Sequence, residues 1–184
     1  NVELKEEVNR LRDYVRSLQS LSRAIQRILS EKDMLSLLDK TLYYALTVLD
    51  AQDGALLLLD EEKDELVFVL VQGRVREKLP GYRMPHDEGV AGWVAQQREP
   101  LIVNNTRLDP RFSSRVDKAF DFHTDSILAV PMIARDKMLG VIEVLNKSGG
   151  HDFIVADQDL LMLLAVIAAT AIPTAPATSG HRGR

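Results

Sequence analysis

The sequence contains no cysteine, and this absence alone excludes several kinds of chemistry. Without thiols the chain forms no disulfide, offers no thiolate nucleophile or metal ligand, and carries no chromophore through a thioether bond. Basic residues are in the minority, since 23 Lys and Arg stand against 27 Asp and Glu for a formal net charge of −4. That balance predicts no attraction to nucleic acid or to an anionic membrane surface.

Long apolar runs and a starting methionine are absent too. The longest uncharged apolar run, 160–172, has about 13 residues, where a membrane span needs roughly 20. It is therefore predicted to be a buried helix. The chain begins at Asn1, which we interpret as a piece of a longer protein, and it shows no signal peptide. The length of 184 residues predicts one domain with appendages, and we expect it in the cytoplasm.

Glycine and proline are missing from the first thirty residues, which favours a long helix. Alternating spacings of four and three separate its apolar positions, the pattern of a coiled-coil seam. We predict a dimerisation helix over 1–30 and a homodimer. A surface helix folded back on its own domain is the alternative. The seam residues are Leu4, Val8, Leu11, Val15 and Leu18.

A single domain is predicted over 31–172, followed by a disordered tail or linker over 173–184. Apolar periodicity predicts a helix ending near Leu49, with a turn over 50–54, and a closing helix over 156–172 that Pro173 stops. Two hairpins are expected, from strands over 55–59 and 66–71 and from strands over 126–134 and 138–145. Short helices are expected over 89–97 and 114–120, and a short strand over 101–103.

This order of elements predicts an α+β fold with a central antiparallel sheet and helices on both faces. The segment between the two hairpins is about fifty residues long, and connections of that length are usually lids or binding elements. We therefore expect a ligand between the sheet and the segment over 73–125.

Several motifs stand in the order typical of GAF domains, and over 30–172 the chain resembles that family. The matching stretches are Gly89-Val90-Ala91-Gly92-Trp93-Val94-Ala95, Pro100-Leu101-Ile102-Val103, Asp109-Pro110-Arg111-Phe112, the strand over 126–132 and the strand over 139–147. The resemblance implies the GAF (PAS-like) fold and a regulatory, non-catalytic module that senses small molecules. It also implies a covalently linked output domain, which is a kinase, cyclase, phosphodiesterase or transcriptional activator.

Glu143 is the most informative single residue. It shares one face of its predicted strand with Val141 and Leu145, while both faces are apolar. A buried carboxylate needs a partner, which could be a ligand or an internal Arg or Lys. In family members that bind cyclic nucleotides, the corresponding Glu faces the ligand.

The residues around the short helix over 89–97 have two interpretations each. Gly89 stands before that helix, where open amides suit an anion, but the interpretation that it only shapes the turn is preferred. Gly92 is expected to let the helix pack tightly. Trp93, the only tryptophan, is a ligand contact or an anchor of the core or lid.

The end of the domain resembles a signature of cyclic-nucleotide-binding GAF domains. Asn146, Lys147, Phe153 and Asp157 match it, and Gln158 replaces its final Glu. The signature implies a structural bridge between Lys147 and Asp157 that holds the last strand to the last helix.

The residues that bind the ligand in those relatives are only partly present in this chain. Thr124 matches the pattern, but Phe120 and Ala55 stand at positions where the relatives bind the ligand through a hydroxyl group. The loss of two hydroxyls removes hydrogen bonds of about 1 kcal/mol each. A cyclic nucleotide is therefore a less favoured alternative, while Phe112, Phe120 and Phe122 favour a more apolar or aromatic organic ligand.

The predicted ligand-binding residues are Trp93, Phe112, Phe120, Thr124, Ser126 and Glu143. The four histidines show no metal-ligand spacing, and no phosphate loop or nucleophile elbow is present, so neither a metal nor an enzymatic activity is predicted. The family's free-methionine-sulfoxide reductases use cysteines, which excludes that activity. A ligand-free dimerisation or protein-interaction module is the alternative function.

Overall fold

The computed structural model describes residues 33–173 and, before them, only positions 5, 7–9, 12, 13, 15, 16, 19, 20 and 23. Those earlier positions are all helical. Three of the five predicted seam residues, Leu4, Leu11 and Leu18, lie outside the described residues, and so does the tail after 173. The coiled coil and the tail therefore stay predictions.

Helix α2 (Met34–Leu49) begins at Asp33, whose side chain accepts a hydrogen bond from the backbone N–H of Ser36 over 3.0 Å. This contact satisfies one of the free amides of the first turn. The helix ends at Asp50 in the left-handed conformation, with φ of 51°. The predicted end at Leu49 is confirmed. The predicted turn over 50–54 is wrong, because strand β1 already starts at Ala51.

Six strands form one antiparallel sheet in the order β3-β2-β1-β6-β5-β4. Their bounds are β1 Ala51–Asp60, β2 Glu65–Gln72, β3 Arg83–Pro85, β4 Leu101–Val103, β5 Ile127–Ala134 and β6 Lys137–Lys147. Both predicted hairpins are confirmed, as β1–β2 and β5–β6. The edge strand β3 was not predicted, since three residues carry no detectable alternation.

The two hairpins join where β1 pairs with β6 in the centre of the sheet. The long segment between them contains β3, α3 (Gly89–Gln97), β4 and α4 (Arg115–Phe120). It leaves the sheet at one edge and re-enters at the other, so its helices must cross one face.

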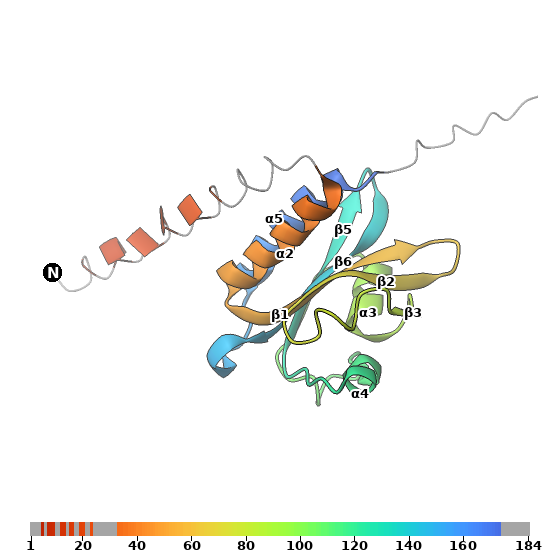
Figure 1. Cartoon of the computed structure of the whole chain (residues 1–184). Coiled ribbons are helices and arrows are strands. Elements are labelled where there is room, and N and C mark those ends of the chain that lie inside the picture. Colours follow the sequence, from red (N-terminus) through yellow and green to blue (C-terminus); the bar gives the residue numbers. More distant parts are fainter. Residues whose placement is uncertain are drawn as a thin grey trace, which may run out of the picture.

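The sheet is covered on both faces, as the sequence predicts. Helix α2 and the closing helix α5 (Val155–Ala171) lie side by side on one face, and α3 and α4 lie on the other (Figure 1). Alternate residues of β6 divide between the two apolar clusters, with Ile142 and Val144 toward α2 and α5 and Val141 toward α3. Among the described residues, no helix is both long and apolar enough to cross a membrane.

Candidate functional site

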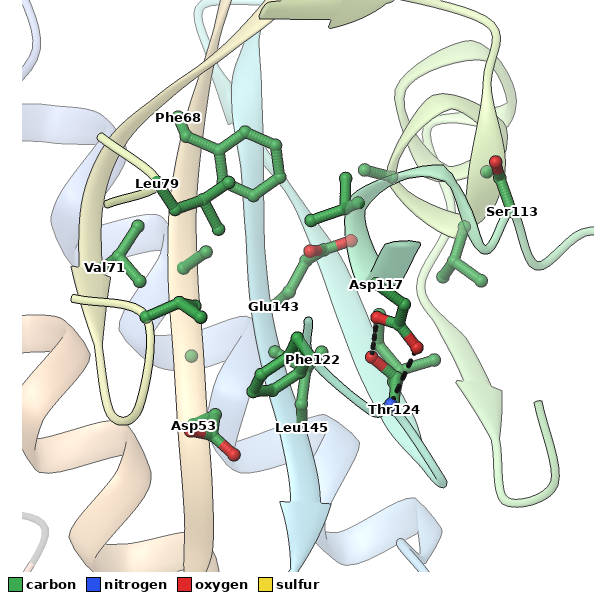
Figure 2. Close-up of a pocket in the computed structure, with 18 of the residues that line it drawn as sticks. Asp53, Phe68, Val71, Leu79, Ser113, Asp117, Phe122, Thr124, Glu143 and Leu145 are labelled. Carbon is green, nitrogen blue, oxygen red and sulfur yellow. Dashed lines mark hydrogen bonds between the residues drawn. The ribbon is translucent and has the colours of Figure 1, made fainter. Parts of the chain in front are cut away.

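A cavity of about 70 Å³ lies between the sheet and the middle segment, on the face that α3 and α4 cover. Strands β1, β2 and β6 form its floor, and the segment over 75–124 forms its cover (Figure 2). Most of the wall is apolar and comes from Ala55, Phe68, Val71, Val75, Leu79, Met84, Val90, Phe112, Val116, Phe122, Ile127 and Leu145. The polar side chains in the wall are Asp53, Gln72, Ser113, Asp117, Thr124 and Glu143.

Glu143 stands in the middle of β6 and points its carboxyl group into the cavity, between Phe68 and Asp117 (Figure 2). The residue is only 7% exposed. Within the part of the chain that the structure describes, this carboxyl group has no hydrogen-bond or ion-pair partner. Burial raises the pKa of Glu143 from 4.5 to about 7, because the ionised form loses its hydration. An internal Arg or Lys partner, one of the two interpretations of Glu143, is therefore not found there.

The other two carboxylates of the wall are already bonded to protein donors. Asp53 accepts hydrogen bonds from the backbone N–H of Arg74 and from its guanidinium group, each over 2.9 Å. The bonded carboxylate holds the pKa of Arg74 above its ordinary value. Asp117 accepts two bonds of 2.8 Å from Thr124, one from the backbone N–H and one from the hydroxyl group. Glu143 thus differs from both, since it alone lacks a protein donor.

Aromatic and cationic side chains hold the cover together. The guanidinium carbon of Arg74 lies 4.6 Å from the centre of the Phe122 ring, which joins the loop after β2 to the loop after α4. The ring of Tyr82 packs edge-on against Phe120, with 5.2 Å between the ring centres, and lies tilted against Phe68 at 6.1 Å. These contacts tie the two halves of the middle segment to each other and to the sheet.

The N-terminus of α3 faces the cavity through its first three residues, Gly89, Val90 and Ala91. Gly89 adopts φ of +71°, a conformation that L residues rarely reach. Gly92 packs so closely on the preceding turn that an added Cβ would lie 2.5 Å from the carbonyl carbon of Asp87. The expected role of Gly92 in tight packing is supported, and the positive φ of Gly89 accounts for a glycine there without any anion.

An outer cleft of about 530 Å³ lies on the other side of the cavity wall. The two spaces share four residues, namely Phe112, Asp117, Phe122 and Thr124. The cavity would therefore open into the cleft if the pair of Asp117 and Thr124 and the ring of Phe122 moved outward.

Three of the six predicted ligand-binding residues line the cavity: Phe112, Thr124 and Glu143. Trp93, Phe120 and Ser126 are not among its lining residues. The guanidinium carbon of Arg111 lies 5.1 Å from the centre of the Trp93 ring. This contact fits the alternative role of Trp93 as a lid anchor.

Phe120 and Ser126 make protein contacts instead. The ring of Phe120 packs on Tyr82. The hydroxyl group of Ser126 accepts a hydrogen bond of 3.4 Å from the backbone N–H of Lys147. Phe120 therefore supports the cover, and Ser126 supports the end of strand β6, while neither lines the cavity.

Most of the cavity wall was missed from sequence. Val75 and Leu79 lie in a loop that has no periodicity, and Asp53 was assigned to a turn rather than to β1. Phe122 was expected to favour an apolar ligand, but was not placed among the site residues. Alternation along β2 could have found Phe68, which shares its cluster with Leu66.

The residues with a predicted structural role meet at one end of the sheet. Lys147 forms the expected ion pair with Asp157, which joins β6 to α5. Asp157 also accepts a hydrogen bond of 2.9 Å from the backbone N–H of Ile154 and so caps α5. Phe153 is buried and exchanges two backbone hydrogen bonds with the side chain of Asn104, of 2.8 and 3.0 Å.

Asn146 connects β6 to the loop before β5. Its side-chain oxygen accepts a hydrogen bond of 2.8 Å from the backbone N–H of Asp125, and its amide group donates to the carbonyl of His123 over 2.9 Å. This residue therefore fixes the end of the middle segment against the sheet. Among the described residues, no cluster of three or more His, Asp or Glu side chains is placed to hold a metal ion.

A six-stranded antiparallel sheet with paired helices on one face and a covered cavity on the other defines an α+β domain with a candidate ligand site. Residues 33–172 match the family model described as GAF domain, so the chain belongs to the GAF family. The resemblance seen in the sequence is thereby confirmed.

Two curated relatives are cyclic-nucleotide phosphodiesterases. The chain is 30% identical over 142 residues to the probable 3′,5′-cyclic phosphodiesterase pde-5 of Caenorhabditis elegans, covering 72% of this chain and 19% of that protein. It is 33% identical over 76 residues to the cone cGMP-specific 3′,5′-cyclic phosphodiesterase subunit alpha′ of Mus musculus, covering 41% of this chain and 9% of that protein. The chain thus spans less than a fifth of the length of either relative.

A solved structure supports the fold. The GAF domain of a phosphoenolpyruvate-protein phosphotransferase from Coxiella burnetii superposes with a TM-score of 0.77 at 20% identity, covering 84% of this chain and 91% of that one.

Proposed function

We propose that this GAF domain is a small-molecule-sensing regulatory module of a larger signalling protein, with its ligand in the cavity beneath the middle segment. The observation that supports this most is the lone carboxyl group of Glu143, buried in a largely apolar cavity without a protein partner. Burial of such a group is costly. Groups with strongly perturbed pKa values in clefts are concentrated at functional sites.

The ligand must open the cavity before it fits. An engineered cavity of about 150 Å³ is known to hold one benzene molecule, whereas this cavity measures about 70 Å³. Movement of Phe122 and of the pair formed by Asp117 and Thr124 would join the cavity to the outer cleft. We infer that ligand binding shifts the middle segment outward.

The sheet offers a route from the cavity to the helices. Strands β1 and β6 carry cavity residues on one face, and on their other face they pack against α2 and α5. A ligand changes the output only if it binds two arrangements of these elements with different affinity. We propose that the helices before and after the domain pass the change to a covalently linked output domain, either a kinase, a cyclase, a phosphodiesterase or a transcriptional activator.

A cyclic nucleotide is the second ligand class to consider, because two relatives are named as cyclic-nucleotide phosphodiesterases. Ala55 stands in the wall where a hydroxyl residue would bind such a ligand, and Phe120 packs on Tyr82. Neither of these two residues offers a hydroxyl group, so we favour a smaller and more apolar ligand.

Thermal shift and native mass spectrometry test the proposal. The panel contains cyclic nucleotides, other nucleotides, aromatic acids, 2-oxo acids and small amines, each tested on the wild type and on Ala55→Leu, which fills the cavity. We expect at least one compound to raise the melting temperature of the wild type alone. If no compound does so and nothing copurifies with the protein, the sensing function is wrong.

A ligand-free dimerisation or interaction module is the second candidate. The outer faces of α2 and α5 expose large apolar side chains, namely Leu35, Tyr43, Leu163 and Val166. A homodimer through these helices and the preceding helix would cover them. This candidate would be favoured if no compound of the panel changed the dissociation constant of the dimer.

A further inference from the structure

We propose that the cavity takes a compact ligand with an apolar body and a cationic head group, which donates its hydrogen bonds to the carboxylate of Glu143. This inference rests on the proposed sensing function and names the chemistry of its ligand. It follows from the charges in the cavity wall, from their partners and from the size of the space.

Among the residues that the structure describes, three carboxyl groups line the cavity and no Lys, Arg or His side chain does. The charge of Asp53 is offset by the guanidinium group of Arg74, which forms an ion pair with it over 2.9 Å. Asp117 accepts hydrogen bonds only from the amide and hydroxyl groups of Thr124, which are neutral donors, and the single positive charge of Arg74 acts on Asp117 as well as on Asp53, so it cannot offset both carboxylates. With Glu143 ionised, the cavity therefore has a negative potential that attracts a cation and repels an anion.

The positive end of helix α3 does not make the electrostatic potential of the cavity positive. A helix terminus is equivalent to roughly half a positive elementary charge, which is less than one ionised carboxylate. The carboxylate of Glu88 stands at the same terminus and bonds to the Ser113 hydroxyl over 2.6 Å and to Arg115 over 2.5 Å. Arg115 offsets the charge of Glu88, but a phosphate inside the cavity would still meet the carboxylates of Asp117 and Glu143, so a phosphate-bearing ligand is disfavoured.

The remaining surface suits a small hydrocarbon body. Phe68, Val71, Leu79 and Met84 present only apolar atoms to the space. Among the carboxyl groups of the described wall, Glu143 is the one that lacks a protein donor, so the ligand needs a donor group at the end that meets Glu143. A cation bonded to this carboxylate would form the charge-assisted hydrogen bond that the protein leaves unmade.

Binding of a cation must also release a proton. The pKa of Glu143 is about 7, so below that pH the residue is mostly protonated and must ionise to pair with the ligand. The other titratable groups of the described wall are Asp53 and Asp117, and Arg74 is paired with Asp53. Below pH 7, the affinity for the cationic ligand should therefore rise about tenfold for each unit by which the pH increases, and above pH 7 it should stay constant.

Matched probes test the head group. Isobutylamine is compared with isobutanol, and benzylamine with benzyl alcohol, because each pair differs in charge and hardly in shape. Benzoate and 3′,5′-cyclic GMP supply the anionic members. Titration calorimetry is run on the wild type, on Glu143→Gln and on Glu61→Gln, an exposed residue that serves as the control.

We expect an amine to bind the wild type and Glu61→Gln at least tenfold more tightly than its alcohol at pH 8. In Glu143→Gln this preference should disappear. Titrations at pH 6 in two buffers of different ionisation enthalpy should show nearly one proton released per amine bound, and nearly none at pH 8.

Each other outcome overturns the inference. Equal binding of amine and alcohol, tighter binding of an anion, or an amine preference that survives Glu143→Gln would each show that Glu143 is not a counter-ion for the ligand. In those cases the sensing function still stands, since a compound binds. If neither amine binds, the inference fails, and the sensing function fails with it only when the whole panel described above also gives no binding.

Discussion

Ala55 of β1 and Glu143 of β6 are direct partners in the antiparallel register, and on the other side of β6 Glu143 is opposite Ala129 of β5. The carboxylate is therefore flanked by the two small side chains of its neighbouring strands. Ala55 lines the cavity, whereas Ala129 is fully buried and does not. The space beside Glu143 exists on the β1 side because Ala55 leaves it open.

The two alanines should respond differently to enlargement. Ala55→Val places two methyl groups in the cavity, so we expect the free energy of unfolding to stay the same or to rise by up to about 1 kcal/mol. No such space exists beside Ala129, so Ala129→Val should lower the free energy of unfolding by about 1–3 kcal/mol through overpacking. Urea unfolding measures both changes.

Ligand binding gives a second comparison on the same variants. Ala55→Val should weaken the binding of any cavity ligand at least about tenfold, or roughly 1.4 kcal/mol. If both variants lose the same stability and Ala55→Val binds the ligand normally, the cavity is not where the structure places it.

The hairpins and the long helices could be predicted because their patterns are local. Alternation along β6 put Glu143 on the same face as Val141, and both side chains lie on the side that α3 covers. The start of β1 could not be predicted, because Ala51 and Asp53 have low strand propensity and are held in the sheet by pairing with β6. Tertiary hydrogen bonds decided that boundary.

The site could be predicted only where a residue lay on a regular element or matched a family motif. Glu143 met both conditions, and Thr124 met the second. Val75 and Leu79 lie in an irregular loop, whose path over the sheet depends on contacts such as that between Arg74 and Phe122. Contacts between segments nearly fifty residues apart leave no periodic trace in the sequence.

The ion pair between Lys147 and Asp157 should contribute to stability. Both side chains are largely buried, with 16% and 12% exposure, and Asp157 also caps α5. Asp157→Asn leaves the ammonium group without its counter-ion, so we expect the free energy of unfolding to fall by about 1–3 kcal/mol. Urea unfolding at pH 7 measures the loss.

The matched control is Glu61→Gln, which removes the exposed pair between Glu61 and Lys137. That pair should be worth less than about 1 kcal/mol, because water screens it. Equal losses in the two variants would mean that the bridge between β6 and α5 adds nothing beyond a surface ion pair.

The predicted dimer can be tested at two described positions of its seam. Val8 and Val15 are helical, seven residues apart, and 40% and 47% exposed, as expected of apolar residues that lack their partner helix. Changing both to Glu places like charges in the seam, so we expect a dimer to become a monomer in sedimentation velocity.

The control carries the same added charge away from the seam. Asn9→Glu with Ser20→Glu changes two exposed helical positions outside the alternating pattern, and this variant should remain a dimer. A seam variant that keeps its dimer would show that association uses another surface, for which the exposed faces of α2 and α5 are the candidates.

The burial of Glu143 predicts a pH dependence of stability. Its pKa in the folded protein is about 7 against an ordinary value of 4.5, so between these values the folded state holds a proton that the unfolded state has lost. The contribution of Glu143 to the free energy of unfolding therefore falls by about 3 kcal/mol as the pH rises from 4.5 to 7. Outside that pH range its contribution is constant. Glu143→Gln cannot ionise and should lack this fall. Urea unfolding of both proteins from pH 5 to pH 8 measures the difference, and parallel curves would mean that the Glu143 carboxyl group is hydrated or paired in solution.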